Sequence, residues 1–297
     1  MDKYPAISII LITYNRGYCI DRAIKSVINQ TYQDWELLIV DNNSEDDTDF
    51  VVNSFKDPRI SLYKINNEGI IAKSRNFGIK HALGKYIAFL DSDDWWDKEK
   101  LSISIKYLNK NYDIVYHDLF KITTLKDEMS FFKKTVKARD LQKPIFIDLL
   151  LNGNGLTQSS VVVSKDLLNK VGGYSEKLDL ITAEDYQVWL EIAKFSDNFK
   201  YIPYTLGFYW HGLDNLTSPK KTIVSIKALQ KIYAKELQLY GVPGWMYYSF
   251  ARSFLLLNDY KKSSKYALSA MIKHKSTYIK LKAFATWLEA KYKQLIT

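Results

Sequence analysis

The 297-residue chain contains a single cysteine, Cys19, so it cannot form an internal disulfide, and its composition is compatible with a reducing cytoplasm. Although 47% of the residues are apolar, no apolar run approaches the roughly 20 residues that a membrane-spanning helix needs. Residues 1–5 lead directly into a strand-like run and leave no room for a secretory signal. These absences predict a cytoplasmic protein without disulfides or membrane spans.

Acidic residues are scarce near the C-terminus. Residues 220–297 carry 15 Lys and Arg but only three Asp and Glu, a net charge of +12, whereas residues 1–219 carry 27 Lys and Arg against 30 Asp and Glu. The overall charge of +9 therefore comes from the C-terminal part. This asymmetry predicts two regions with different partners, residues 1–219 and residues 220–297.

The apolar pattern of the first 90 residues predicts alternating strands and helices. Strand-like runs cover residues 7–12, 35–40, 60–65 and 86–90. Helical spacing covers residues 20–28, 45–55 and 71–83, the last of which we expect Gly84 to close. The series predicts an α/β fold with a parallel sheet and right-handed crossovers.

The rest of the chain is less regular. Residues 112–117 and 159–163 are predicted strands, residues 121–143 are polar without a clear pattern, and residues 182–195 are a predicted helix. After Pro219 several amphipathic helices are expected, and residues 251–260 with 263–272 resemble one tetratricopeptide-like hairpin. One unit is too little for a repeat array, so we expect only an α-helical C-terminal region.

Carboxylates crowd the end of the strand-like run 86–90. They are Asp91, Asp93, Asp94 and Asp97. In open α/β sheets ligands bind at the carboxyl ends of the strands, and crowded carboxylates repel one another unless a cation lies between them. The usual cation is a hard divalent ion that also binds substrate phosphates. A second Asp-x-Asp, Asp47 to Asp49, is instead expected to be first-turn acid of a helix.

Five segments in order resemble the inverting, nucleotide-sugar-dependent glycosyltransferases of family 2, which have the GT-A fold. The segments are residues 8–16, 38–44, 72–78, 89–94 and 183–186. They cover roughly residues 5–215, so the basic C-terminal part lies outside the resemblance. The resemblance implies a Rossmann-like, mostly parallel sheet flanked by helices and a nucleotide-diphospho-sugar donor, with UDP-sugar favoured.

The resemblance implies a nucleotide site formed by two loops. Asp41 would accept a hydrogen bond from the uracil N–H, although its local sequence equally suits an N-cap of the next helix. Thr13 and Tyr14, with Asn15 and Arg16 in the same loop, would contact the nucleoside.

Arg75 is the expected contact to the nucleotide or its diphosphate, because a guanidinium can grip oxyanions bidentately. It could alternatively pair with one of the aspartates at the sheet edge. Asp91, with Ser92 beside it, would contact the donor ribose, and Asp93 would bind Mn²⁺ or Mg²⁺ and so bridge to the diphosphate. Asp94 is expected to support this arrangement.

Asp97 is expected to cap a helix beginning near Lys98. His211, in a Tyr-Trp-His run, would be either structural or a further contact to the metal or diphosphate. Trp95, Trp96 and Trp210 could form a stacking platform for sugar or could anchor loops in the core.

Asp185 is the catalytic base that the resemblance implies, with Glu184 orienting it or the acceptor. An inverting displacement needs one base to deprotonate the acceptor hydroxyl and no covalent intermediate. On local sequence alone, Glu184 and Asp185 are ordinary acids of a first helical turn.

The basic region 220–297 has three readings: contact with an anionic membrane on its cytoplasmic face, contact with a protein or second subunit, and nucleic-acid binding, for which no recognition motif is present. We favour the membrane surface, since related enzymes often glycosylate lipid-linked acceptors. The expected activity is glycosyl transfer to a glycan or lipid-linked glycan in surface polysaccharide or glycolipid synthesis. The alternatives are a non-catalytic nucleotide- or carbohydrate-binding scaffold, and a sugar-phosphate nucleotidyltransferase, which the lack of a glycine-rich, lysine-bearing loop at the first strand disfavours.

Overall fold

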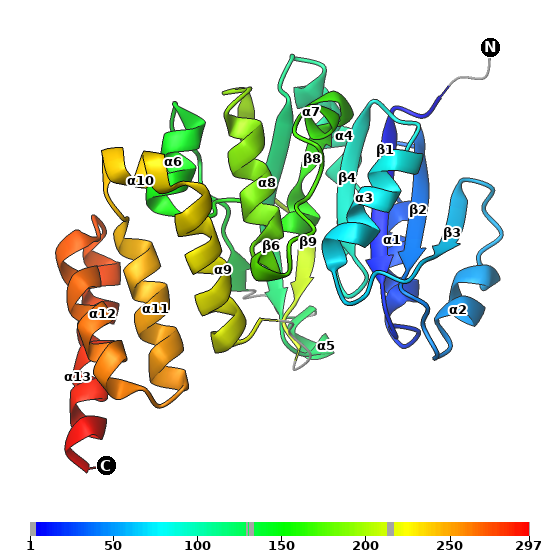
Figure 1. Ribbon diagram of the computed structural model, residues 1–297. Coiled ribbons are helices and arrows are strands. Elements are labelled where there is room, and N and C mark those ends of the chain that lie inside the picture. Colours follow the sequence, from blue (N-terminus) through cyan, green and yellow to red (C-terminus); the bar gives the residue numbers. More distant parts are fainter. Residues whose placement is uncertain (1–3, 129, 131–133, 213–216, 297) are drawn as a thin grey trace. The chain divides into compact units, whose positions relative to one another are not determined.

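A computed structural model describes residues 4–128, 130, 134–212 and 217–296. The chain divides into two compact units. The first comprises residues 1–145, 155–176 and 191–214, and the second comprises residues 146–154, 177–190 and 215–297. Each unit has its own packing, and Figure 1 labels most of the elements of both.

The first unit is built on a sheet whose first four strands are parallel, as the sequence predicts (Figure 1). These strands are β1 (Ile7–Thr13), β2 (Trp35–Asp41), β3 (Ile60–Lys64) and β4 (Tyr86–Asp91), in the order β3-β2-β1-β4. Buried apolar side chains fill β1, β2 and β4 on both faces, which explains their uninterrupted apolar runs.

Beyond β4 the sheet becomes mixed, with three strands that the sequence pattern did not predict, β5, β7 and β9. The remaining strands are β8 (Val162–Ser164), β6 (Ile114–Ile122), β9 (Phe199–Trp210), β5 (Trp95–Trp96) and β7 (Lys134–Val136). β8 runs antiparallel to β4 and β6, whereas β9 is parallel to β6. The strand predicted at 159–163 is wrong in its first half, where Gln158–Ser160 form a 3₁₀ turn. The strand predicted at 112–117 extends further, to Ile122.

Helices flank this sheet. They are α1 (Ile20–Ile28), α2 (Thr48–Ser54), α3 (Ile71–His81), α4 (Lys100–Leu108), α5 (Leu125–Glu128) and α7 (Lys165–Lys170). The apolar face of α1 packs into a core of Ile, Leu and Val from the parallel strands. The helix predicted at 20–28 is confirmed to the residue.

Two predicted helix ends are wrong for local reasons. α2 begins at Thr48 rather than at residue 45, because the preceding residues form side-chain-bonded turns, and Asp49 lies in its first turn as expected. α3 ends at His81 and Gly84 does not close it. Gly84 instead packs against β1, where an added Cβ would lie 2.6 Å from the Ser8 amide nitrogen.

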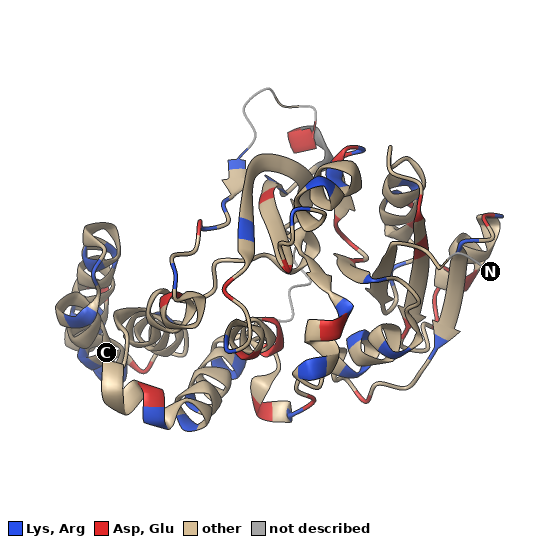
Figure 2. Cartoon of the chain, turned by 90° about the horizontal axis from the view of Figure 1, so that it is seen from above, with Lys and Arg blue, Asp and Glu red and all other residues tan. Residues whose placement is uncertain are grey.

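The second unit is helical, which confirms the expected α-helical C-terminal region (Figure 1). Its helices are α6 (Ile145–Asn152), the first turns of α8 (Glu184–Ala193), α9 (Pro219–Ile232), α10 (Ala234–Tyr240), α11 (Gly244–Leu256), α12 (Tyr260–Lys273) and α13 (Thr277–Ile296). Lys and Arg mark several of these helices, as the blue segments in Figure 2 show.

The predicted hairpin in this unit is present with shifted ends, as α11 and α12. The Ser263 hydroxyl donates to the Ala251 carbonyl at 2.9 Å, and the ring of Tyr266 stacks on that of Phe254 at 5.5 Å between centroids. In the part of the chain that the structure describes, no helix combines the length and the apolar character needed to cross a bilayer.

Candidate active site

The register of the parallel strands brings three predicted site residues to one edge of the sheet. Thr13 at the end of β1 is aligned with Asp41 at the end of β2, and Ile12 is aligned with Asp91 at the end of β4. The carboxyl ends of parallel strands are where α/β folds bind ligands. The sheet therefore places Thr13, Asp41 and Asp91 together at the edge where α/β folds bind ligands.

Asp41 is fully buried and its carboxylate is held by Ser44. The Ser44 amide donates to Asp41 Oδ2 at 2.9 Å, and the Ser44 hydroxyl donates to Oδ1. The same hydroxyl accepts a hydrogen bond from the Asn15 amide at 2.8 Å. Asp41 is thus not the N-cap of α2, because that helix begins seven residues later, and Ser44 joins the β2 loop to the loop after β1.

The loop after β1 is fixed by side-chain contacts to the segment before α2. Asn15 has a left-handed backbone, with φ of 50°, and its side chain accepts from the Glu45 amide at 2.9 Å. The Arg16 amide donates to the Thr48 hydroxyl at 3.1 Å. Tyr14 is 54% exposed, so its ring is available to a ligand.

Thr13 carries an unsatisfied polar atom. Among the described residues, its hydroxyl is buried without a hydrogen-bond partner. A buried hydroxyl without a partner costs free energy unless a ligand or water satisfies it. Thr13 therefore has the chemistry of a ligand contact.

Arg75 is buried on α3 and its guanidinium lies 3.2 Å from Asp91 Oδ1. The guanidinium also lies over the ring of Tyr174, 5.4 Å from its centroid. The pairing of Arg75 with an aspartate at the sheet edge, which the sequence left as an alternative, is present. The side chain of Asp91 remains 33% exposed.

The next two carboxyl groups, Asp93 and Asp94, have pKa values above the ordinary value of an aspartate. Burial, and then the charge of Asp91, raise the pKa of Asp93 to about 6. Burial, and then the charges of Asp93 and Asp91, raise the pKa of Asp94 well above its ordinary value. Asp94 is fully buried and accepts from the Trp210 amide at 2.8 Å. A cation beside Asp93 would reverse the effect on that group, since an opposite charge favours the carboxylate.

The donor set at this edge suits a hard divalent ion that shares its coordination with substrate. Asp91 and Asp93 offer carboxylate oxygens, which Mg²⁺ and Mn²⁺ prefer, and such ions are commonly held by one or two carboxylates plus phosphates. Among the residues that the structure describes, no three His, Cys, Asp or Glu side chains are grouped so as to hold a metal by themselves. His211 is exposed, and its amide donates to the Ile122 carbonyl at 2.8 Å.

Ser92 and Asp97 accept hydrogen bonds that stabilise the backbone around them. Ser92 is buried, and its carbonyl accepts from the thiol of Cys19 at 3.7 Å. Asp97 accepts from the Glu99 amide at 2.9 Å. α4 begins at Lys100, so Asp97 closes the turn before that helix rather than capping a helix at Lys98.

The tryptophans after the cluster are loop anchors. Trp95 is sandwiched between the Arg22 guanidinium, 3.6 Å from its ring centroid, and the parallel ring of Phe208 at 4.9 Å. Trp96 is buried and its indole N–H donates to the Ser159 carbonyl at 2.7 Å. Because both faces of Trp95 are covered, its ring cannot stack on a sugar.

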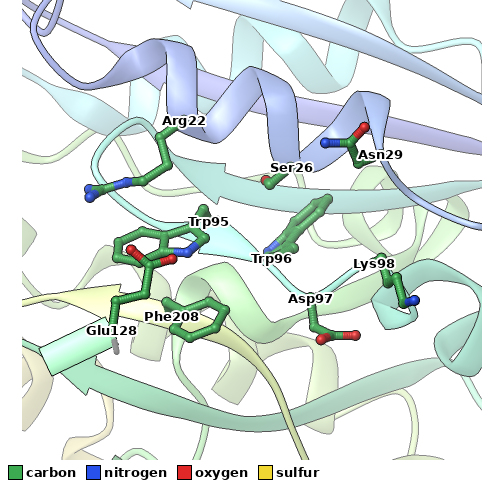
Figure 3. A pocket seen from close by; sticks show the side chains of 9 residues that line it. All are labelled: Arg22, Ser26, Asn29, Trp95, Trp96, Asp97, Lys98, Glu128 and Phe208. Atoms are coloured by element: carbon green, nitrogen blue, oxygen red, sulfur yellow. The ribbon is translucent and has the colours of Figure 1, made fainter. Parts of the chain in front are cut away.

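A cavity of about 600 Å³ borders these rings. Figure 3 shows its lining by Arg22, Ser26, Asn29, Trp95, Trp96, Asp97, Lys98, Glu128 and Phe208. Arg22 also donates to the Asp93 carbonyl at 3.0 Å, so one residue of the cavity wall holds the backbone of the loop that carries Asp93.

Glu184 and Asp185 begin α8 in the second unit. Glu184 is buried and accepts from the Thr182 amide at 2.8 Å, which stabilises a turn where Thr182 has φ of 80°. Asp185 is half-buried and accepts from the Tyr186 amide at 2.6 Å and from the side-chain amide of Asn154 at 3.3 Å. Glu184 therefore shapes the turn, and Asp185 carries the more accessible carboxylate.

Sequence reasoning missed three residues that hold this site together. Ser44 links two loops, Arg22 holds the Asp93 carbonyl, and the Ser159 hydroxyl accepts from the Asp91 amide at 3.2 Å. Each acts through contacts between segments far apart in the chain. No local pattern could have identified Arg22 or Ser159, whereas Ser44 is the last residue of the segment 38–44, which carries part of the family resemblance.

Comparison with known proteins agrees with this geometry. The family model of glycosyl transferase family 2 matches residues 8–172. The chain is 36% identical over 194 residues to the UDP-Glc:alpha-D-GlcNAc-diphosphoundecaprenol beta-1,3-glucosyltransferase WfgD of Escherichia coli. That match covers 65% of this chain and 72% of WfgD.

Two solved structures share the fold at low identity. S. aureus TarS 1-349 in complex with UDP-GlcNAc has a TM-score of 0.59 at 16% identity, and the match covers 97% of this chain and 91% of that one. The mannosyltransferase PcManGT from Pyrobaculum calidifontis, in complex with GDP-Man and Mn²⁺, also has a TM-score of 0.59 at 16% identity, covering 99% and 88%. With this GT-A architecture and the match over more than half of its length, the chain belongs to glycosyl transferase family 2.

Proposed function

We propose that this glycosyltransferase moves a sugar from a UDP-sugar to a hydroxyl of a lipid-linked glycan, in one inverting step assisted by a divalent metal. The observation that carries the proposal is the group of carboxylates at the end of β4, where Asp93 and Asp94 are protonation-prone beside Asp91. Such a group needs a cation, and a nucleoside diphosphate brings one.

The nucleoside lies, in this proposal, between the loops after β1 and β2. Asp41 accepts from the uracil N–H, and Tyr14 covers the base with its exposed ring. Thr13 offers its unsatisfied hydroxyl, and Asn15 and Arg16 complete the loop. The UDP-GlcNAc bound to the structurally similar TarS supports a uridine nucleotide.

The diphosphate lies beside Asp91 and Asp93, with Ser92 between them. Arg75 holds the Asp91 carboxylate at 3.2 Å and so orients it toward the ribose. Asp93, with His211 as a further candidate, would hold Mn²⁺ or Mg²⁺. The bound metal supplies neutralisation of the charge that develops on the departing UDP.

Asp185 is the proposed base. Its carboxylate takes the proton from the acceptor hydroxyl while that oxygen attacks the anomeric carbon opposite the leaving diphosphate, so the configuration inverts in a single displacement. Glu184 holds the preceding turn through the Thr182 amide and thereby fixes where α8 begins.

The acceptor is proposed to be membrane-bound, with residues 1–219 as the transferase region and residues 220–297 as the membrane-contacting one. The relative WfgD acts, by its name, on a diphosphoundecaprenol-linked sugar. An enzyme that uses such an acceptor gains from residence on the membrane surface.

Helix α13 has the face that this contact requires. Large apolar side chains are exposed on it: Tyr278, Leu281, Phe284, Leu288, Tyr292 and Leu295. At about 100° per residue they cover roughly a third of the helix circumference. The opposite face is buried through Ala283, Thr286 and Ala290.

Lysines flank the exposed apolar face of α13 on both sides. Lys280 and Lys291 lie along one border, and Lys282 and Lys293 lie along the other, by the same helical spacing. The second border also carries one exposed acid, Glu289. An apolar stripe flanked by four lysines and one acid fits the interface of an anionic lipid surface, where each Lys contributes about 1 kcal/mol. This charge pattern favours lipid over a second copy of the same basic chain.

Transfer from UDP-glucose to a GlcNAc-α-diphospho-lipid tests the proposed activity. We expect product with Mn²⁺, none with EDTA, and a β-linkage by NMR. Asp93→Asn should lose metal-dependent UDP binding, whereas Asp185→Asn should retain UDP binding and lose at least about 100-fold in kcat.

Asp47→Asn is the matched control, because it alters the other Asp-x-Asp at an exposed helix start and should leave the rate unchanged. Normal transfer by Asp185→Asn would overturn the assignment of the base. Absence of turnover with every UDP-sugar, despite UDP binding, would overturn the proposed activity in favour of a binding scaffold.

A further inference from the structure

We propose that Asn154 is a positioning residue for Asp185, and that Trp245 from the C-terminal helices holds the loop that carries Asn154. This inference rests on the proposed role of Asp185 as the base. It gives the C-terminal region a part in catalysis that is separate from membrane contact.

Hydrogen-bond donors contact both oxygens of the Asp185 carboxylate. The Asn154 side-chain amide donates to Oδ2 at 3.3 Å, and the Tyr186 amide donates to Oδ1 at 2.6 Å. The Tyr186 amide belongs to the helix itself and cannot fix the carboxylate's rotation alone. Asn154 is a neighbour outside α8 that contacts the second oxygen and so restrains the rotation of the carboxylate.

Asn154 reaches this position because the chain turns sharply after α6. Gly153 has φ of +84°, a left-handed conformation that favours glycine, and its amide donates to the Leu149 carbonyl at 2.8 Å. A Cβ at position 153 would also lie 3.4 Å from the Trp245 indole. The turn and the indole therefore occupy adjoining space.

Trp245, in the first turn of α11, contacts both sides of this arrangement. Its indole N–H donates to the Leu150 carbonyl at 3.0 Å, which fixes the end of α6. Its ring meets the Tyr186 ring edge-to-face at 5.6 Å, and the Tyr186 hydroxyl donates to the Leu149 carbonyl at 2.7 Å. One indole thus ties the segment before Asn154 to the residue after Asp185.

The Asn154 contact favours one of the two protonation states of the Asp185 carboxyl group. An amide donor favours the ionised carboxylate, which is the form that accepts the acceptor's proton. Asn154→Ala removes that donor. Asn154→Asp keeps the shape of the side chain but places a second negative charge beside Asp185, which favours protonation of the pair.

The test compares pH profiles of kcat/KM with UDP-glucose and a GlcNAc-diphospho-lipid. We expect Asn154→Ala to lower kcat/KM about 10- to 100-fold with KM for UDP-glucose unchanged, and to move the acid limb to higher pH. Asn154→Asp should move the acid limb of the kcat/KM profile to higher pH than Asn154→Ala does, although an aspartate is closer in shape to asparagine than an alanine is. Trp245→Phe keeps the ring contact and loses the N–H donor, so it should lie between wild type and Trp245→Ala.

Asn152→Asp is the matched control, since Asn152 ends α6 and bonds to Asp148 rather than to α8. Thermal unfolding of each variant checks that it folds. An acid limb in Asn154→Asp equal to that of the wild type or of Asn154→Ala would overturn the inference. If Asp185→Asn is inactive and the Asn154 variants keep the wild-type profile, only this inference fails; if Asp185→Asn is active, the proposed base fails first.

Discussion

The guanidinium of Arg75 lies 3.2 Å from the Asp91 carboxylate, and Arg75 is almost wholly buried while Asp91 is one-third exposed. The pair thus has a buried cation and a carboxylate whose free edge faces solvent. This asymmetry is what a ligand site needs, because the protein holds one oxygen and leaves the other available. It also makes Arg75 more sensitive to change than its exposed neighbours.

Arg75→Lys is expected to lower kcat/KM for the UDP-sugar about 10-fold or more, because an ammonium cannot reproduce the guanidinium geometry. Arg75→Ala should also lower the free energy of unfolding by about 2 kcal/mol, less than for a fully buried pair because water screens Asp91. Steady-state kinetics and denaturant unfolding measure the two effects. Lys73→Ala, on the same helix as Arg75, breaks a solvent-accessible ion pair with Glu68 in the loop before that helix and should change neither quantity by much.

Ser44→Ala is expected to weaken UDP binding about 5- to 10-fold, since it removes the hydroxyl that joins Asn15 to Asp41. Isothermal titration calorimetry with UDP measures this loss. Ser54→Ala removes a hydroxyl that bonds only within α2 and serves as the control. Equal affinities of the two variants would contradict a role of Ser44 in the nucleotide site.

Metal binding is expected to depend on pH through Asp93. Its pKa is raised to about 6, so below that pH a proton competes with the metal, and affinity for Mn²⁺ should fall about tenfold per pH unit. Without metal, the folded state holds this proton more tightly than the unfolded chain, so stability should decrease as pH rises from about 4 through 6. Titration of Mn²⁺ at pH 5 to 8 measures the first effect; a pH-independent affinity, or the same pH dependence in Asp93→Asn, would contradict it.

Lys100→Met is expected to stabilise the first unit by about 1–3 kcal/mol. The Lys100 ammonium group is fully buried without a hydrogen-bond partner among the described residues, and burial lowers its pKa well below the ordinary value. The Trp96 ring, 3.5 Å away, offsets only part of that cost.

The sign of this effect follows from proton binding. The unfolded chain protonates Lys100 at neutral pH and the folded state resists it, so wild-type stability rises with pH toward the ordinary lysine pKa, and Lys100→Met should flatten that rise. Lys106→Met, exposed on the same helix, should change stability by less than about 0.5 kcal/mol. Thermal and denaturant unfolding between pH 6 and 10 measure both variants. Destabilisation by Lys100→Met would show that the amine is required.

The apolar face of α13 is expected to govern vesicle binding. Leu281→Glu with Leu288→Glu should lower partitioning into anionic phosphatidylglycerol vesicles more than tenfold, since burying each Leu contributes about 1.5–3 kcal/mol. Leu256→Glu, an equally exposed site on α11, is the control. Unchanged partitioning of the double variant into vesicles would contradict a lipid partner. So would a wild-type dimer in solution that dissociates in the double variant.

Much of the parallel part of the sheet was predictable because β1, β2 and β4 are buried on both faces and so carry nearly unbroken apolar runs. The helix at Ile20–Ile28 was predicted to the residue for a similar reason, since its apolar stripe is regular. β5 and the long β9 were missed. β5 has only two residues, and most of β9 carries mixed polar and aromatic side chains whose pairing depends on distant strands.

Sequence alone determined the order of the elements from β1 to β4, the acid group after β4 and the basic C-terminal region, because each of these features is a pattern of residues close together in the chain. Tertiary structure decided what those residues touch. Packing brings the Arg75 guanidinium to the Asp91 carboxylate and covers both faces of the Trp95 ring. It also brings the Asn154 side-chain amide to the Asp185 carboxylate. These contacts join residues 16 to 113 positions apart along the chain, and such pairings arise only when packing brings separate segments together.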